Sequence, residues 1–151
     1  MANHKIIPSI WFNADKGNSS MLLEYYKEIF ADNFIAGNII PLGNTPSGNA
    51  EMCEVKIFGQ PYSFLNTSNE HHPLNDAISF VIRCDNQIEI DTYWNYFTKD
   101  GKASQCGWCA DRYGLRWQII PVNLGQLMAR PNAFDILMQQ HKIIINDFLT
   151  Q

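Results

Sequence analysis

One order of secondary-structure patterns occurs twice in this chain of 151 residues: a strand, a helix and then three strands. Alternating or apolar runs in the first half predict strands at residues 6–12, 34–42, 51–58 and 62–66. Similar runs in the second half predict strands at residues 77–84, 102–105, 106–110 and 115–120. Each first strand is followed by a helical pattern, one capped by Asn18 or Ser19 and one at residues 87–97. The repeat is one of organisation, and it indicates two similar modules.

The whole chain, residues 1–151, is expected to form a single domain with modules at about 5–67 and 76–121. The polar loop 67–75 is the expected join between them. After Pro121 the apolar spacing becomes helical, so residues 123–150 are expected to form helices that pack on the sheet.

Composition excludes several classes of partner. The net charge is −4, and no run of Lys or Arg is dense enough to follow a phosphate backbone, which excludes nucleic acid. No apolar stretch approaches the roughly 20 residues of a membrane span, and no signal-peptide core follows the polar N-terminus. We therefore expect a cytoplasmic protein without a membrane partner. In that compartment the four cysteines are expected to be reduced.

The segment 105–121 predicts a hairpin whose outgoing strand carries one polar residue among apolar ones. Asp111 and Gly114 bracket its turn, and Gln118 stands between Trp117 and Ile119. A polar side chain in that position either faces a cavity or needs a buried partner.

Four short motifs in this doubled pattern resemble a known family: Trp11-Phe12, Tyr25-Tyr26-Lys27, Cys106-Gly107-Trp108, and the run 111–118. The chain resembles the PhnB-like branch of the glyoxalase/bleomycin-resistance/dioxygenase (vicinal oxygen chelate) superfamily, often labelled 3-demethylubiquinone-9 3-methyltransferase. The resemblance implies an α+β fold in which two βαβββ modules form open half-barrels around a cavity. It also implies a homodimer, and pairing with a second chain would cover exposed sheet edges.

Metal-dependent relatives carry a His- and Glu-rich quartet on the first and last strand of each module. The resemblance places the matching positions at Ile7, at Asn66 or Phe64, at Ser79 and at Gln118. Ile7 has no donor atom, and neutral hydroxyl and amide groups hold divalent ions poorly, so we expect no metal cofactor, although one held in an unusual way stays open. Alternatively, Ser79 and Gln118 simply satisfy one another or a buried water.

Two further clusters resemble metal or redox sites. His71 and His72 are adjacent in a polar loop, where neighbouring side chains point in opposite directions, so we expect a solvated pair. Cys106 and Cys109 have Cys-x-x-Cys spacing, but on an extended strand their Cα atoms would lie about 10 Å apart, beyond disulfide reach. We therefore expect packed, unreactive thiols, with Cys106 still able to line the cavity.

The predicted strands carry aromatic rings and amides that suit a pocket for a small, largely apolar or planar molecule. Gln118 and Trp117 are opposite in phase, and we expect Gln118 to face the pocket because it matches the superfamily ligand position. The predicted ligand-binding residues are Trp11, Phe64, Asn66, Ser79, Cys106, Trp108 and Gln118.

Three other functions stay open. One is a metal-dependent lyase, isomerase or dioxygenase that holds its ion through Gln118 with Asn66 or His71. Another is the quinone-ring methyltransferase of the family label, although no Gly-rich strand-to-helix loop followed by an acidic residue is present for S-adenosylmethionine. The third is a purely structural role, in which side chains would fill the cavity.

Overall fold

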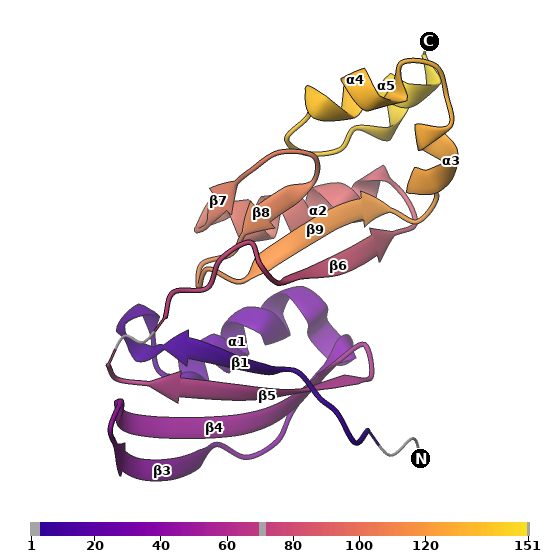
Figure 1. Ribbon diagram of the computed structural model, residues 1–151. Coiled ribbons are helices and arrows are strands. Elements are labelled where there is room, and N and C mark those ends of the chain that lie inside the picture. The colour runs from indigo at the N-terminus through magenta and orange to yellow at the C-terminus, as the bar shows by residue number, and fades with distance from the viewer. Residues whose placement is uncertain (1–3, 70–71, 151) are drawn as a thin grey trace. The chain divides into compact units, whose positions relative to one another are not determined.

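A computed structural model describes residues 4–69 and 72–150 and divides the chain into two compact units, residues 1–73 and 74–151 (Figure 1). Each unit contains one sheet and one long helix. The fold is α+β: the second unit has the order βαβββ, the first has the same order with one further strand, and the described residues form two sheets and no closed barrel, which confirms the predicted fold class. No helix in the described part of the chain combines the length and apolar character needed to cross a bilayer.

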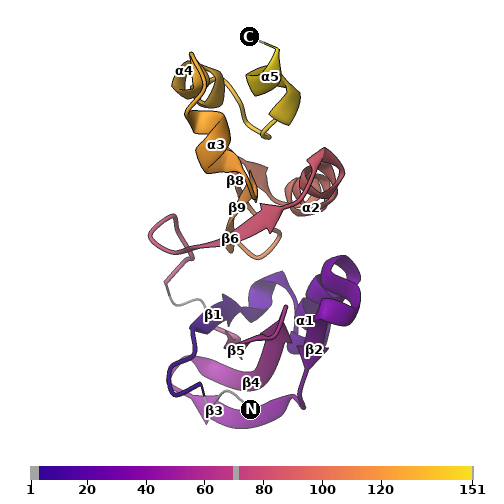
Figure 2. The same ribbon diagram turned by 90° about the vertical axis from the view of Figure 1, so that its right-hand side faces the viewer.

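The first unit begins with β1 (Ser9–Asn13) and α1 (Ser19–Phe30). Its sheet has the order β1-β5-β4-β2, with β1 parallel to β5 (Gln60–Thr67) and β4 (Gly48–Ile57) antiparallel to β5. A short 3₁₀ turn, η1 (Ala14–Lys16), joins β1 to the helix, and another, η2 (Ala31–Asn33), follows it. Figure 2 shows α1 lying against one face of this sheet.

The second strand predicted in the first half is two strands in the structure. β2 (Phe34–Ala36) and β3 (Ile40–Thr45) both pair with β4, and the extended strand is interrupted between them, starting at Gly37. The strand β3 runs to Thr45 and β4 starts at Gly48, so only two residues separate them. Thr45 explains this, because its hydroxyl donates to Gly48 O at 2.8 Å and accepts from the backbone N–H of Ser47, which closes a tight turn.

Aromatic side chains form the core of the first unit. The side chain of Asn18 accepts a hydrogen bond from Met21 N and starts α1, as predicted. Two turns further along α1, Tyr26 packs against Phe12 and Phe64 from the sheet, with ring centroids 6.3 and 5.7 Å away. Each such buried ring contributes about 1.5–3 kcal/mol, so this contact fixes which face of the sheet α1 covers.

The second unit repeats the plan. β6 (Ser79–Cys84) leads through Asp85 and the N-cap Asn86 into α2 (Gln87–Lys99), and the sheet order is β6-β9-β8-β7. The remaining strands are β7 (Lys102–Ala103), β8 (Trp108–Ala110) and β9 (Arg116–Pro121). Phe97 of α2 stacks on Trp117 of β9 with centroids 4.8 Å apart and planes 4° from parallel.

The tail after Pro121 is helical, as predicted, and forms α3 (Leu124–Met128), α4 (Ala133–Met138) and α5 (Ile145–Leu149). Leu127, Ile143 and Phe148 make a small core of their own, against which Ile120 of β9 packs. The tail therefore packs on the end of the second sheet.

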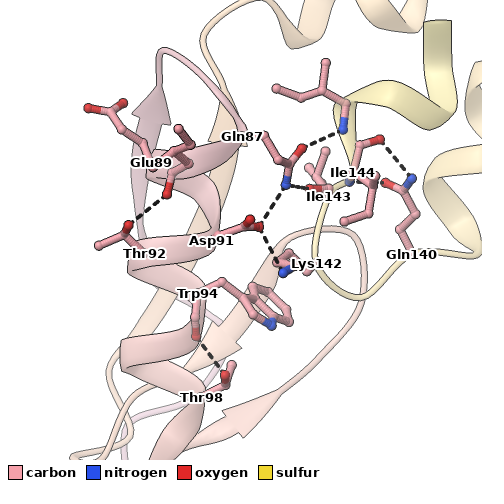
Figure 3. A network of polar contacts seen from close by, with 12 residues as sticks. Gln87, Glu89, Asp91, Thr92, Trp94, Thr98, Gln140, Lys142, Ile143 and Ile144 are labelled. Carbon is pink, nitrogen blue, oxygen red and sulfur yellow. Dashed lines mark hydrogen bonds and ion pairs between the residues drawn. The ribbon is translucent and has the colours of Figure 1, made fainter.

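Polar contacts also hold the tail to α2 (Figure 3). The Gln87 side chain donates to Ile143 O at 3.0 Å and accepts from Ile145 N at 2.9 Å. Beside it, Lys142 Nζ lies 2.9 Å from the carboxylate of Asp91. The two Gln87 hydrogen bonds satisfy backbone groups that a short helical segment cannot satisfy by itself.

Candidate functional site

Each sheet has one face packed on its long helix and one face that the helix leaves uncovered. Successive residues of a strand point to opposite faces. Because Phe12 and Trp117 contact the helices, their neighbours Trp11 and Gln118 point to the other face. We call these the helix-free faces of the first and second sheets. Trp117 thus lies under α2, and Gln118 points to the helix-free face, so the two residues are opposite in phase as predicted.

An apolar row crosses the helix-free face of the first sheet. Trp11 is in register with Leu65, Leu65 with Met52, and Met52 with Ile40, so the row spans four strands. Trp11 is half-buried, and its Nε1–H donates to Thr67 Oγ1 at 2.8 Å. The row is a partly exposed surface that suits an apolar or planar group.

Phe64 and Asn66, two predicted ligand-binding residues, lie on the opposite face from Trp11. Phe64 is only 2% exposed and packs edge-on against Phe12 at 5.0 Å. Asn66 is 4% exposed and donates to the backbone carbonyl of Gly17 at 3.2 Å. The structure therefore does not bring either residue together with Trp11. The physical reason is that Phe64 is in register with Ile10 and Asn66 with Phe12, on the side that α1 covers.

The helix-free face of the second sheet carries three of the predicted residues. Trp108 on β8 is in register with Gln118 on β9, and Gln118 with Val81 on β6. The amide of Gln118 donates from Nε2 to Ser79 Oγ at 2.8 Å. Trp108, Gln118 and Ser79 are all half-buried, so they form a polar and aromatic surface that solvent or a ligand can reach.

Cys106 was predicted on a strand, and the structure places it in a turn. Its φ is 58° and that of Gly107 is 86°, and Trp108 N donates to Gln105 O at 2.9 Å. The thiol donates to Leu137 O in the tail at 3.4 Å. The strand prediction failed because alternation of residue types does not reveal a left-handed backbone at a non-glycine position.

The other cysteines are packed inside the two units. Cys109 is in register with Trp117 on the covered face and is 1% exposed, and burial raises the pKa of its thiol to about 12. All four cysteines, Cys53, Cys84, Cys106 and Cys109, are free thiols. Because Cys109 is buried in a strand and Cys106 lies in a turn, the Cys-x-x-Cys spacing here does not make a dithiol centre.

A small pocket adjoins Trp108 on the same face. Its volume is about 120 Å³, and its lining includes Asp76, Lys102, Ser104, Trp108 and Arg116. Among these residues, only Trp108 was predicted from the sequence to bind a ligand. Arg116 could have been found, because it precedes Gln118 by two residues and therefore shares its face. Lys102 could not, since its proximity depends on the pairing of β7 with β8.

The superfamily's metal quartet does not fit the residues present. Ile7 has no donor atom and precedes β1. The side-chain amide of Asn66 donates a hydrogen bond to the Gly17 carbonyl, and that of Gln118 donates one to the Ser79 hydroxyl. Across residues 4–69 and 72–150, no three His, Cys, Asp or Glu side chains are grouped so that they could hold a metal ion. His71, the remaining predicted donor, lies outside the described residues.

S-adenosylmethionine does not fit the usual strand-to-helix site either. That site needs a glycine-rich turn whose backbone approaches the ligand at the start of a helix. Here β6 connects to α2 through Asp85 and Asn86, and the Asn86 side chain accepts a hydrogen bond from Glu89 N. The connection from β1 to α1 consists of the 3₁₀ turn η1, Gly17 and Asn18, so it contains a single glycine and is not glycine-rich.

Comparison with known proteins identifies relatives over most of the chain. A family model described as 3-demethylubiquinone-9 3-methyltransferase matches residues 4–120. No curated protein sequence matches the chain. The solved PhnB protein from Bacillus cereus superposes with a TM-score of 0.65 and 22% identity, over 78% of this chain and 98% of its own.

Two other solved structures share the architecture. A protein from Pseudomonas aeruginosa superposes with a TM-score of 0.57 and 16% identity, over 77% of this chain and 96% of its own. The fosfomycin resistance protein FosX from Listeria monocytogenes superposes with a TM-score of 0.52 and 12% identity, over 83% of this chain and 97% of its own. At such identities the likeness shows the fold alone, which is that of the glyoxalase/bleomycin-resistance proteins.

Proposed function

The chain belongs to the 3-demethylubiquinone-9 3-methyltransferase family, the PhnB-like branch of the glyoxalase/bleomycin-resistance superfamily, and we propose that it binds a small organic molecule. Within each unit the proposed binding surface is the helix-free face of the sheet. The observation that carries the proposal is that each face presents one half-buried tryptophan, Trp11 or Trp108.

A tryptophan on an uncovered sheet face is well suited to hold a ligand. Its ring offers a large rigid surface at a small cost in side-chain entropy. The apolar row beside Trp11 extends that surface, and the Gln118 amide beside Trp108 adds hydrogen-bonding capacity that would orient a polar substituent. The other two tryptophans, Trp94 and Trp117, are buried and belong to the core.

A metal-dependent lyase, isomerase or dioxygenase is the second candidate. In its favour, FosX shares this fold with a TM-score of 0.50 in a structure complexed with Mn(II) and sulfate. Against it stand the neutral donors Ser79 and Gln118, which lack the charge that holds a divalent ion. Methyl transfer is the third candidate, and titration calorimetry with S-adenosylmethionine tests it, since any measurable binding heat would support it.

A fluorescent, uncharged aromatic probe tests the proposal without knowledge of the natural ligand. We expect N-phenylnaphthylamine to bind saturably, and Trp11→Ala or Trp108→Ala to weaken binding about tenfold by removing a stacking surface. Phe134→Ala is the matched control, because Phe134 is 64% exposed and lies on α4, which is part of neither sheet. No saturable binding, or an equal loss in Phe134→Ala, would overturn the proposal.

A further inference from the structure

The pocket beside Trp108 contains more positive than negative charge. Lys102 and Arg116 contribute two cations to its lining, and Asp76 contributes one carboxylate. The chain as a whole has a net charge of −4, so this excess is local. A local excess of cations favours an anionic group over a neutral one.

The charges in the pocket are not all used within the protein. Arg116 Nε lies 2.8 Å from the Asp76 carboxylate, and its Nη1 donates to the backbone carbonyls of Leu74 and Gly114 at 3.0 and 2.7 Å. These bonds neutralise Asp76 and fix the guanidinium, whose side chain is 24% exposed. Within the described residues, Lys102 Nζ has no hydrogen-bond or ion-pair partner.

The position of the pocket connects it to the aromatic surface. Trp108 lines the pocket and is also in register with Gln118, while Arg116 lies two residues before Gln118 on β9, about 7 Å along the strand. The pocket volume of about 120 Å³ is below the 300 Å³ or more typical of a whole ligand site. It therefore suits one functional group of a larger molecule.

We infer that the ligand carries an anionic group, such as a carboxylate, sulfonate or phosphate, which binds in this pocket at Lys102 and Arg116 while its apolar or aromatic part lies against Trp108. Ser104, in the same lining, adds a hydroxyl donor. This inference rests on the proposed function and specifies the chemical class of the ligand. Exposed cations also attract anions from a distance, so binding should weaken with salt.

Two probes that differ by one charge test the inference. Anilinonaphthalene sulfonate and N-phenylnaphthylamine share the aromatic system, and only the first carries a sulfonate. We expect the sulfonate to bind about tenfold more tightly at low ionic strength, since a hydrogen bond to a charged group has this order of magnitude. Lys102→Gln should remove most of that advantage and leave the affinity for N-phenylnaphthylamine unchanged.

The control variant removes the same charge elsewhere in the unit. Lys99 is exposed at the end of α2, which packs on the covered face of the sheet, so Lys99→Gln should change neither affinity. If both probes bind equally and Lys102→Gln has no effect, the anionic subsite is wrong while the proposed function stands. If neither probe binds, the proposed function itself fails. An equal loss of sulfonate affinity in Lys99→Gln would also overturn the subsite, because it would show a nonspecific charge effect.

Discussion

Gln118 and Ser79 are hydrogen-bonded to one another across the parallel strands β9 and β6, with 2.8 Å between Gln118 Nε2 and Ser79 Oγ. Both residues occupy positions at which metal-dependent members of the superfamily are expected to carry ligands. Here the two positions are neutral and satisfy each other. The pair is therefore a fixed polar element of the helix-free face.

The first prediction concerns divalent metal ions. Because hydroxyl and amide groups supply no charge, we expect Mn(II) to show no stoichiometric binding when free ion is counted by electron paramagnetic resonance. Tight binding of one Mn(II) per chain would contradict this expectation. In that event, His71→Ala would tell whether the histidine outside the described residues supplies the missing donor.

The second prediction concerns the coupling between Gln118 and Ser79. A double-mutant cycle with Ser79→Ala and Gln118→Ala should give an interaction energy of about 1 kcal/mol, the usual value for a neutral hydrogen bond. Urea unfolding of the four proteins measures it. A coupling indistinguishable from zero would show that the two side chains do not hold each other in solution.

The third prediction concerns Asp111, which is 3% exposed and holds the hairpin before β9 together. Its carboxylate accepts hydrogen bonds from Tyr113 N, Leu115 N and Trp117 Nε1 at 2.8, 3.1 and 2.8 Å. Asp111→Ala should lower the free energy of unfolding by about 3 kcal/mol, since three donors lose their partner. Arg112→Ala, which removes an exposed and solvent-screened ion pair with Asp100, should cost much less than Asp111→Ala. Similar losses in the two variants would refute this assignment.

The fourth prediction concerns stability at alkaline pH. Burial raises the thiol pKa values of Cys84 and Cys109 from 9.0 to about 12, and nearby carboxylates add to both shifts. The native state keeps these protons, whereas the unfolded chain releases them above pH 9. The free energy of unfolding therefore falls as pH rises from 9 toward 12, by about 1 kcal/mol per thiol between pH 8 and pH 10.

Chemical unfolding at pH 8 and pH 10 measures this loss, and Cys109→Ala should lose about 1 kcal/mol less than the natural sequence over that interval. Burial also raises the pKa values of Tyr62, Tyr93 and Tyr113. Part of the decrease in unfolding free energy with pH therefore remains in both proteins. Stability that rises between pH 8 and pH 10 would be incompatible with buried, protonated thiols.

The doubled order of elements could be predicted from the sequence because helical and strand periodicities are local properties. The N-cap at Asn18, the helical tail and the opposite phases of Trp117 and Gln118 were all predicted correctly. The break at Gly37 and the turn at Cys106 were missed. Both depend on backbone conformation, which residue polarity does not report.

The composition of the site was less predictable. Alternation shows that Phe64 and Asn66 share a face, but not that α1 covers that face. The cations Lys102 and Arg116 come together only through pairing of β7, β8 and β9, which residue spacing along one strand does not contain. The sequence therefore predicts which residues alternate, while packing decides which of them are accessible.

The four tryptophans offer the most direct test of the proposed binding surfaces, because each gives its own indole N–H resonance in a nitrogen-proton correlation spectrum. On saturation with N-phenylnaphthylamine, we predict that the resonances of Trp11 and Trp108 shift, while those of the buried Trp94 and Trp117 stay in place. A bound probe that leaves Trp11 and Trp108 unchanged would contradict the claim that the helix-free faces bind the ligand.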